Sequence, residues 1–292
     1  MKVSVIGGTG TVGSEVVSRL IEHRVDTRVL VHSAEKARNL PAEVEKIGGD
    51  LNAPEILQRL LNGVDRMFLL LPVDKDETKW GLTAVRAARD AALQRIVYMS
   101  VAMPPGSETI PHFGSKLPIE NSIKESGLEY TILRPSNFYQ NDIYIGEWIA
   151  SKGIYASPIG EVGVNRVDVR DIADAAINAL TEDGHDGKTY NIFGPDDWTG
   201  SSVAEVYTHR LGREVRYMGD DLDVWAENAS KMLPGWIVND FITMYEYFQT
   251  QGFFVMDNPS APLRDVLKHY PRTFEAFVNE IAPVWRAEFA IA

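Results

Sequence analysis

Four glycines near the start of the chain have the spacing of a turn that binds phosphate through its main chain. They are Gly7, Gly8, Gly10 and Gly13, in the sequence Gly-Gly-Thr-Gly-Thr-Val-Gly. An apolar run at residues 3–6 predicts a buried strand before them, and the amphipathic residues 12–21 predict a helix after them. Glycine permits a tight turn and a close approach of N–H groups to a phosphate, and a helix start adds partial positive charge.

Strand, glycine turn and helix in this order predict a dinucleotide-binding turn. The predicted contacts to the diphosphate are Gly7, Thr9, Gly10, Thr11, Val12 and Gly13. The alternative is an ordinary glycine-rich connection between a strand and a helix.

The residues after the second predicted strand, 27–31, bear on which dinucleotide binds. NAD-binding proteins often carry Asp or Glu at this point to hold both ribose hydroxyls. Here the strand is followed by His32 and Ser33, with no acid, and Lys36 and Arg38 come within one to two helical turns. Because a cation and hydroxyl donors favour a 2′-phosphate, we expect NADP in preference to NAD, held by His32, Ser33 and Lys36. Alternatively, Lys36 and Arg38 form a solvated helix face.

These residues require a parallel sheet to position them. The predicted strands are residues 3–6, 27–31, 44–47, 67–71, 95–99 and 129–133, and the predicted helices between them include 55–61 and 80–93. Such alternation predicts an α/β fold with a Rossmann-type doubly wound parallel sheet, whose strands all end at one edge. We expect a dinucleotide-binding domain at residues 1–135, with return segments at about 164–194. A smaller, mainly helical C-terminal cap for the substrate is expected at residues 136–163 and 195–292.

The strand ends at this edge supply further predicted coenzyme contacts. They are Asp50, Leu51, Leu71, Pro72, Ser100, Pro135, Asn137 and Phe138. Asp50 could accept a hydrogen bond from the adenine amino group, or it could cap the helix that follows. Ser100 could contact substrate or coenzyme, or it could cap a loop.

Composition excludes several classes of function. The 292 residues are 45% hydrophobic and carry a formal net charge of −12, so nucleic acid and anionic membrane are not expected as partners. The absence of cysteine excludes disulfides and thiolate chemistry, and the six histidines have no paired ligand spacing, so no metal site is predicted. No apolar run approaches the ~20 residues of a membrane helix, and no signal peptide is expected before the first strand. We therefore expect a cytoplasmic protein, as a monomer or homodimer.

Further motifs are spread along the whole chain. They are Val29-Leu30-Val31, Gly49-Asp50-Leu51, the segment from Arg95 to Ser100, the segment from His112 to Lys116, the segment from Ser126 to Pro135, Asn137-Phe138, the segment from Val169 to Ala173, and Arg272-Thr273-Phe274. With the glycine turn, they make the chain resemble the NmrA-like family of atypical short-chain dehydrogenases/reductases. That resemblance implies a Rossmann fold that binds NAD(P). It also implies either a reductase of quinones or triphenylmethane dyes, or a non-catalytic redox sensor.

Two departures from the family pattern concern chemistry. Relatives that prefer NADP usually carry Arg where this chain has His32. Short-chain dehydrogenases use Tyr-x-x-x-Lys, in which Tyr donates a proton, and this chain has His112 four residues before Lys116. The resemblance places Lys116 at the nicotinamide ribose. His112 could donate the proton, or it could be structural. Without the tyrosine, conjugated and electron-poor acceptors are favoured over simple ketones.

Aromatic and amide side chains after residue 135 predict the substrate site. The predicted substrate-binding residues are Tyr139, Asn141, Tyr144, Trp236 and Tyr245. At helical spacing, such aromatic residues can instead be core. We predict an NAD(P)H-dependent reductase that transfers hydride to a small conjugated or aromatic acceptor, of quinone, dye or enone type. The alternative is an NAD(P)-binding redox sensor without turnover. An epimerase or lyase is a third possibility, which no acid–base pair supports.

Overall fold

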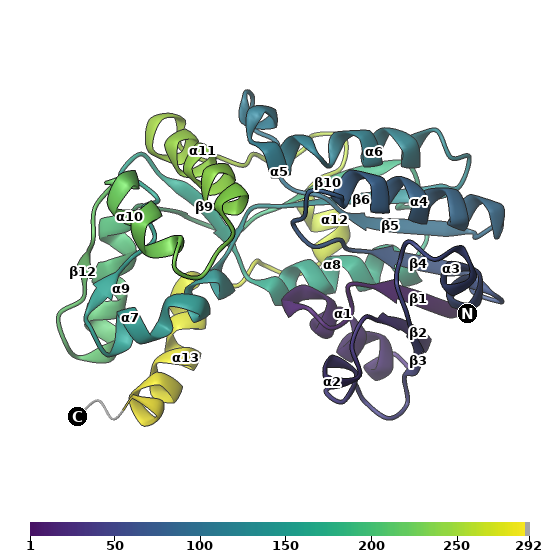
Figure 1. Cartoon of the computed structure of the whole chain (residues 1–292), viewed down its shortest axis with the longest axis horizontal. Helices are drawn as coiled ribbons and strands as arrows, with labels where there is room; N and C mark the ends of the chain where they lie inside the picture. Colours follow the sequence, from purple (N-terminus) through teal and green to yellow (C-terminus); the bar gives the residue numbers. More distant parts are fainter. Residues whose placement is uncertain (290–292) are drawn as a thin grey trace.

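A seven-stranded parallel sheet occupies one half of the computed structural model, which describes residues 1–289 (Figure 1). The strand order is β10-β6-β5-β4-β1-β2-β3, and every neighbouring pair is parallel. The strands are β1 (Lys2–Ile6), β2 (Asp26–Val31), β3 (Glu45–Gly48), β4 (Arg66–Leu69), β5 (Arg95–Met99), β6 (Glu129–Pro135) and β10 (Lys188–Ile192). The predicted doubly wound sheet is confirmed. The strand at 188–192 returns to it beside β6.

Helices cover both faces of this sheet. One layer contains α1 (Thr11–Glu22), α8 (Val169–Thr181) and α12 (Leu263–Leu267), and the other contains α3 (Pro54–Leu61), α4 (Glu77–Asp90) and α6 (Leu117–Lys124). Successive strand residues point to opposite layers, as the pleat requires. Phe68 and Val97 pack with the α1 layer, whereas Met67 and Ile96 pack with the α3 layer. None of the helices in residues 1–289 is long and apolar enough to cross a membrane.

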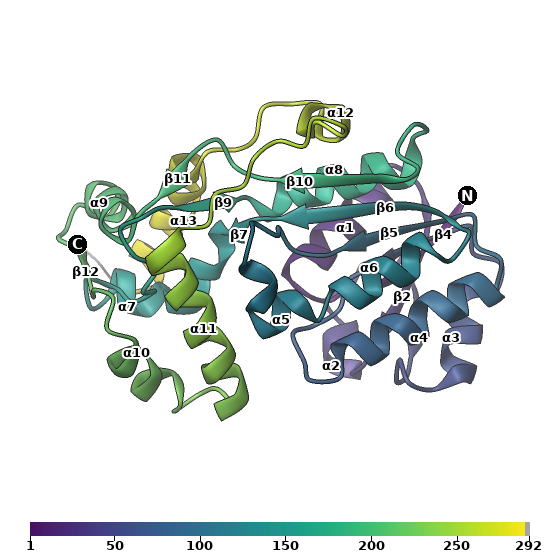
Figure 2. The ribbon, with the colours of Figure 1, turned by 90° about the horizontal axis from the view of Figure 1, so that it is seen from above.

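The second half of the molecule is a cap built of helices and short strands (Figure 2). Its helices are η2 (Tyr139–Ile145), α7 (Gly146–Ala150), α9 (Gly200–Leu211), α10 (Leu222–Ala229), α11 (Gly235–Gln251) and α13 (Phe274–Glu288). Its strands are β7 (Asn137–Phe138), β8 (Ile154–Tyr155), β9 (Val164–Val167), β11 (Asp197–Trp198) and β12 (Arg216–Tyr217). The predicted helix at 141–150 is a 3-10 turn followed by a short α-helix.

One segment of the predicted cap lies against the sheet half. The short helix α12 contacts α8 and β10, and Ala261, Leu263 and Val266 belong to the core of the α1 layer. The chain therefore leaves the cap after α11 and re-enters it at α13. Five helical residues are too few to show a period in the sequence, so the pattern did not reveal this return.

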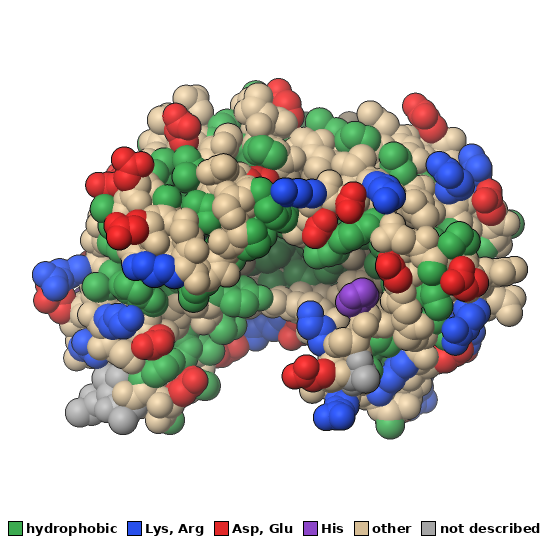
Figure 3. All heavy atoms as spheres, in the orientation of Figure 1, with side chains coloured by type: hydrophobic (Ala, Val, Ile, Leu, Met, Phe, Trp, Pro, Cys, Tyr) green, Lys and Arg blue, Asp and Glu red, His purple; other side chains and the backbone are tan. Residues whose placement is uncertain are grey.

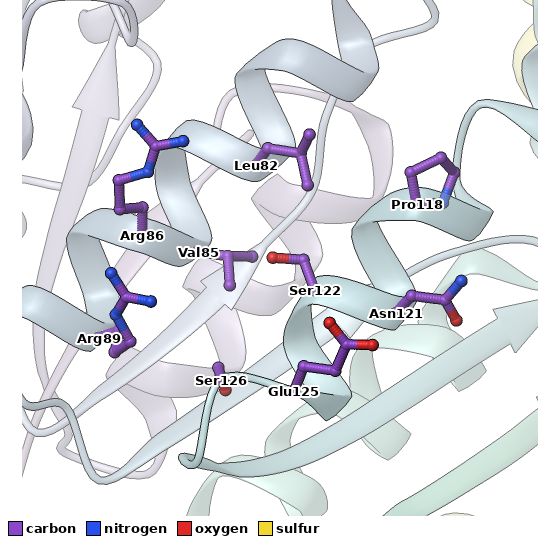
Figure 4. Close-up of a pocket in the computed structure, with 9 residues that line it drawn as sticks. All are labelled: Leu82, Val85, Arg86, Arg89, Pro118, Asn121, Ser122, Glu125 and Ser126. Carbon is purple, nitrogen blue, oxygen red and sulfur yellow. The ribbon is translucent and has the colours of Figure 1, made fainter.

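A shallow groove of about 540 Å³ lies between α4 and α6 on the outside of the sheet half (Figure 4). It is lined by Leu82, Val85, Arg86, Arg89, Pro118, Asn121, Ser122, Glu125 and Ser126. All of these come from the two helices and the turn after α6, so the groove does not include the carboxyl ends of the strands.

Candidate coenzyme and active site

The glycine turn lies at the point where the strand order of the sheet reverses. β1 pairs with β2 on one side and with β4 on the other, and the turn follows β1 directly. In doubly wound sheets, ligands bind beyond the carboxyl ends of the strands at this position. Figure 3 shows a hollow between the two halves there, with hydrophobic side chains in its depth.

The turn has no room for side chains at its base. A Cβ on Gly13 would lie 2.0 Å from the carbonyl oxygen of Gly7, and a Cβ on Gly7 would lie 2.5 Å from that of Leu70. Gly7 also has a φ of +84°, which favours glycine. Above Gly10, by contrast, a Cβ would meet only the Gly7 carbonyl, at 3.5 Å, and Gly10 is exposed.

The start of α1 is open to a ligand. Gly10 is its N-cap and offers no side-chain cap, and no acidic residue occupies the first turn. A helix start with N–H groups uncapped by a side chain is a ready anion site. Val12 is buried, so it can contribute only its main-chain N–H. These features fit a coenzyme diphosphate held by Gly7, Thr9, Gly10, Thr11, Val12 and Gly13.

Exposed polar groups follow β2 and β3. Ser33 Oγ accepts a hydrogen bond from the Lys36 N–H at 3.2 Å and so caps α2 (Ala34–Ala37). His32 and Lys36 are exposed and make no ion pair within residues 1–289. Asp50 accepts from the Asn52 N–H at 2.8 Å, which lowers the Asp50 pKa, with smaller effects from His32 and Lys79. Because α3 begins at Pro54 after Ala53, Asp50 closes a turn before the helix and does not cap it.

The remaining strand-end residues differ in exposure. Pro72 is exposed and Leu51 half-buried, whereas Leu71 and Pro135 are buried. Asn137 and Phe138 are half-buried in β7, where they pair with Arg166 and Val167 of β9.

Arg166 fixes the segment that leads from the sheet into the cap. It is 1% exposed, and its guanidinium donates to both carboxylate oxygens of Asp142, at 2.8 and 3.1 Å, and to the carbonyl of Phe138 at 3.1 Å. Burial opposes the charge of Arg166, but Asp142 outweighs this effect and raises the Arg166 pKa. The ion pair thus sets where Asn137 and Phe138 stand.

Ser100, a predicted coenzyme contact, is hydrogen-bonded to a neighbouring helix. It is 2% exposed, and its hydroxyl donates to Glu120 Oε1 at 2.7 Å. Arg134 donates to both oxygens of the same carboxylate, at 2.9 and 2.6 Å. Burial would raise the Glu120 pKa, but Arg134 lowers it below its usual value. The Ser100 hydroxyl therefore ties the end of β5 to α6, and its contact to the coenzyme stays a prediction.

Lys116 lies in a buried ion pair. Its Nζ donates to Glu77 Oε1 of α4, and the side chains of the pair are 9% and 2% exposed. Ser115 Oγ donates to the other oxygen of Glu77 at 2.9 Å. Glu77 thus compensates the charge of the ammonium and fixes its direction, and two N–H donors of Lys116 remain without a partner in residues 1–289.

His112 contacts the cap. It lies on α5 (Pro111–Gly114), which Figure 2 shows between α6 and α11. Its Nδ1 hydrogen-bonds Asp240 of α11, and the two side chains are 11% and 5% exposed. The loop before α5 is also tied to α11, because the hydroxyl of Tyr247 donates to the carbonyl of Pro105 at 3.0 Å.

Tyr139 is a correction to the predicted substrate residues. It is fully buried in the cap core, with ring centroids 5.2 Å from Phe274 and 6.0 Å from Phe277. Its hydroxyl donates to the carbonyl of Arg272 at 3.2 Å. A substrate cannot reach Tyr139, because its side chain is fully buried. The sequence did not show this, since the spacing of hydrophobic residues is the same in a core and in a pocket.

The other predicted substrate residues are accessible at different places. Asn141 is exposed, whereas Tyr144 is 76% exposed and its hydroxyl lies 3.3 Å from Thr11 Oγ1, at the coenzyme turn. Trp236 is half-buried under Lys75, whose Nζ lies 5.5 Å from the ring centroid. Tyr245 is half-buried, and burial raises its pKa to about 12.

Tyr245 belongs to an aromatic group on α10 and α11. Its ring centroid lies 5.0 Å from that of Trp225, which lies 6.4 Å from that of Phe241. The Tyr245–Trp225 contact is edge-to-face and the Trp225–Phe241 contact is tilted, and aromatic pairs of this kind hold the rings in place. The group supplies aromatic surface in the part of the cap that carries Asp240.

Several functional candidates were not predicted from the sequence: Glu77, Asp240, Lys75 and the pair Asp142 and Arg166. Glu77 precedes the predicted helix at 80–93. Asp240 is the only acid in the first half of an apolar helix, Gly-Trp-Ile-Val-Asn-Asp-Phe-Ile, and that isolation is a signal that could have marked it.

Comparisons with known proteins agree with this architecture. The model of the family described as "NmrA-like family" matches residues 1–278. The NAD(P)H azoreductase of Xenophilus azovorans is 36% identical over 223 residues, which cover 76% of this chain and 78% of that protein. The (4-alkanoyl-5-oxo-2,5-dihydrofuran-3-yl)methyl phosphate reductase of Streptomyces griseus is 31% identical over 232 residues, 79% of this chain and 80% of that protein.

A solved structure extends the likeness to nearly the full chain. The triphenylmethane reductase of Citrobacter sp., complexed with NADP(H), superposes with a TM-score of 0.83 at 25% identity, covering 97% of this chain and 100% of that one. The glycine turn, the sheet order and these matches together lead to one conclusion. The chain belongs to the NmrA-like family.

Proposed function

We propose that this protein is an NAD(P)H-dependent reductase of small conjugated or aromatic acceptors. The observation that carries the proposal is the glycine turn, which leaves no room for a Cβ at its base, is open above Gly10, and faces an aromatic-rich cap across the hollow. Two of the similar proteins, an azoreductase and a triphenylmethane reductase, are named for aromatic acceptors, which supports the proposal.

NADP is the preferred coenzyme in this proposal. Exposed His32 and Lys36 and the Ser33 hydroxyl stand where the 2′ position of the adenosine ribose is expected, and no carboxylate follows β2 directly. A cation favours a 2′-phosphate, and a carboxylate there would repel it. His32 is a weaker anchor than arginine, because a neutral imidazole lacks the bidentate charged fork.

At the other end of the hollow, Lys116 and His112 are the proposed functional residues. A reduced nicotinamide bound at this end supplies the hydride. Lys116, oriented by Glu77, donates to the nicotinamide ribose. Asn137 and Phe138, held by Arg166, flank the ring. Quinones, azo compounds and cationic dyes suit a site without the tyrosine acid, because their conjugation stabilises the reduced product.

The proposal is tested by measuring first the binding of the coenzyme and then its oxidation by an acceptor. Fluorescence titration with NADPH and with NADH should show tighter binding of NADPH. Oxidation of NADPH should then be followed with a quinone, an azo dye and a cationic triphenylmethane dye. Tight binding with no oxidation by any acceptor would favour the redox-sensor alternative, and no binding of either coenzyme would exclude both functions.

A charge-removing variant sharpens the coenzyme assignment. Lys36→Ala should weaken NADPH binding about tenfold and leave NADH binding unchanged, since a hydrogen bond to a charged group contributes about 1.5 kcal/mol or more. Lys231→Ala, an exposed lysine of the cap, is the matched control. An equal loss for both coenzymes would contradict a 2′-phosphate contact.

A further inference from the structure

The pair His112–Asp240 joins the two halves of the molecule, because α5 belongs to the sheet half and α11 to the cap. His112 belongs to the sheet half and Asp240 to the cap, and the carboxylate is 5% exposed. A carboxylate can only accept, so the imidazole donates Nδ1–H to it. Such a partner fixes both the ring orientation and the tautomer of the histidine.

The second ring nitrogen of His112 remains free to act. Within residues 1–289, Nε2 has no hydrogen-bond partner, and it is not among the buried side-chain atoms that lack one, so it is accessible. Phe113 and Phe241 hold the ring edge-to-face, with centroids 4.6 and 5.6 Å from that of His112. The pair therefore presents one accessible nitrogen on a ring whose other contacts are fixed.

We infer that Asp240 is a positioning residue that makes His112 the proton donor, and that this pair is needed only for acceptors that take up a proton. The inference rests on the proposed reductase function. Because Asp240 holds Nδ1, a protonated His112 ring can donate only from Nε2. His112 also lies four residues before Lys116, the spacing that the proton-donating tyrosine has in short-chain dehydrogenases.

The chemistry differs between two acceptors. In an azo dye the N=N π bond breaks. One nitrogen takes the hydride and its electron pair from the coenzyme, which is oxidised, and the other takes the Nε2 proton of His112, which solvent then replaces. A cationic triphenylmethane dye takes the hydride at its central carbon, and the positive charge is lost without any proton transfer.

The principal test compares these acceptors in Asp240→Asn. With NADPH, kcat for the azo dye should fall about 100-fold, the contribution expected of general acid catalysis. The kcat for the cationic dye and the KM for NADPH should stay within about twofold, since their steps need no donated proton. Asp223→Asn, an exposed carboxylate of α10, is the matched control and should change neither dye. If both dyes slow equally in Asp240→Asn, the pair only docks the cap and the inference is wrong.

A second variant guards against misfolding of the first. His112→Asn keeps Asp240 in place and should show the same loss confined to the azo dye. His269→Asn removes a histidine that contacts Asp174 on α8, outside the hollow, and should leave both dyes unchanged. Equal loss with both dyes in His112→Asn would likewise overturn the assignment.

A readout without coenzyme tests the tautomer itself. Long-range ¹H–¹⁵N spectra of the histidine rings, assigned with His112→Asn and recorded at a pH where the rings are neutral, should show the single His112 proton on Nδ1 in the wild type. Asp240→Asn should move that proton at least partly to Nε2. A neutral wild-type ring whose single proton is on Nε2 would overturn the inference even if the enzyme is active. Failure of the wild type to reduce either dye would instead overturn the proposed function, and the inference with it.

Discussion

The two ends of the hollow are built in opposite ways. At the glycine turn, one continuous segment of seven residues, Gly7 to Gly13, offers main-chain groups, and side chains are excluded by contacts as short as 2.0 Å. At the other end, the site is formed by paired side chains from separate segments: Glu77 of α4, His112 of α5, Lys116 before α6 and Asp240 of α11. A backbone site depends on shape, whereas this side-chain site depends on pairing of charges. Substitutions at the two ends should therefore affect stability and coenzyme affinity in different ways.

The largest expected change in unfolding free energy is at the side-chain end, in the ion pair of Glu77 and Lys116. Glu77→Gln leaves the buried Lys116 ammonium without its counter-charge, and breaking such a pair costs about 3–5 kcal/mol of unfolding free energy. Denaturant unfolding measures this change. Glu55→Gln, an exposed residue of α3, is the control.

A paired replacement distinguishes charge from packing at that site. Adding Lys116→Met to Glu77→Gln removes the stranded charge, so the double variant should regain most of the lost unfolding free energy. If the double variant is as unstable as Glu77→Gln alone, shape rather than charge pairing governs this end too.

A smaller effect on stability is expected at the backbone end. Gly13→Ala forces a Cβ against the Gly7 carbonyl and should cost about 1–3 kcal/mol, with coenzyme binding lost because the turn must shift. Gly235→Ala, where a Cβ meets nothing within 4 Å, should leave melting temperature and coenzyme affinity near the wild type. Unchanged coenzyme affinity in Gly13→Ala would refute the assignment of the turn.

The smallest expected effect is a loss of coenzyme affinity on substitution of Tyr144, a cap residue whose hydroxyl lies near the glycine turn. Tyr144→Phe removes the hydroxyl that lies 3.3 Å from Thr11 Oγ1. If that hydroxyl also reaches the coenzyme diphosphate, coenzyme affinity should fall about fivefold, as for one ordinary hydrogen bond. Titration of Tyr270→Phe, an 82% exposed tyrosine, controls for loss of a surface hydroxyl. Equal affinities in the two variants would leave the turn as a purely main-chain site.

The difference between the glycine turn and the side-chain end also explains which parts of the site could be predicted from the sequence. The glycine turn and the strands around it are local patterns, so their positions were predicted within a few residues. Tyr139 was misassigned as a substrate residue because its partner Arg272 is 133 residues away in the sequence. The hydrogen bond from Ser100 to Glu120 was missed because Glu120 lies on another element. Periodicity identifies an apolar face but does not distinguish a core from a pocket.

The ion pairs of the side-chain end could be identified only in the folded structure. His112 was identified through its spacing to Lys116, yet its partner is 128 residues away on a helix of the cap. Glu77 is 39 residues from Lys116 and lay outside the predicted helix. Such pairs arise when helices pack, and a single sequence carries no record of which helices meet.

The path of the chain limits how this scaffold can change during evolution. Residues leave the sheet after β6, return with α8 and β10, and return once more at α12 between α11 and α13. A cap interlaced in this way cannot be exchanged as a cassette by one recombination event, because every junction would have to match. New acceptor preferences should therefore accumulate as point substitutions on α10 and α11, while the nucleotide-binding half stays unaltered.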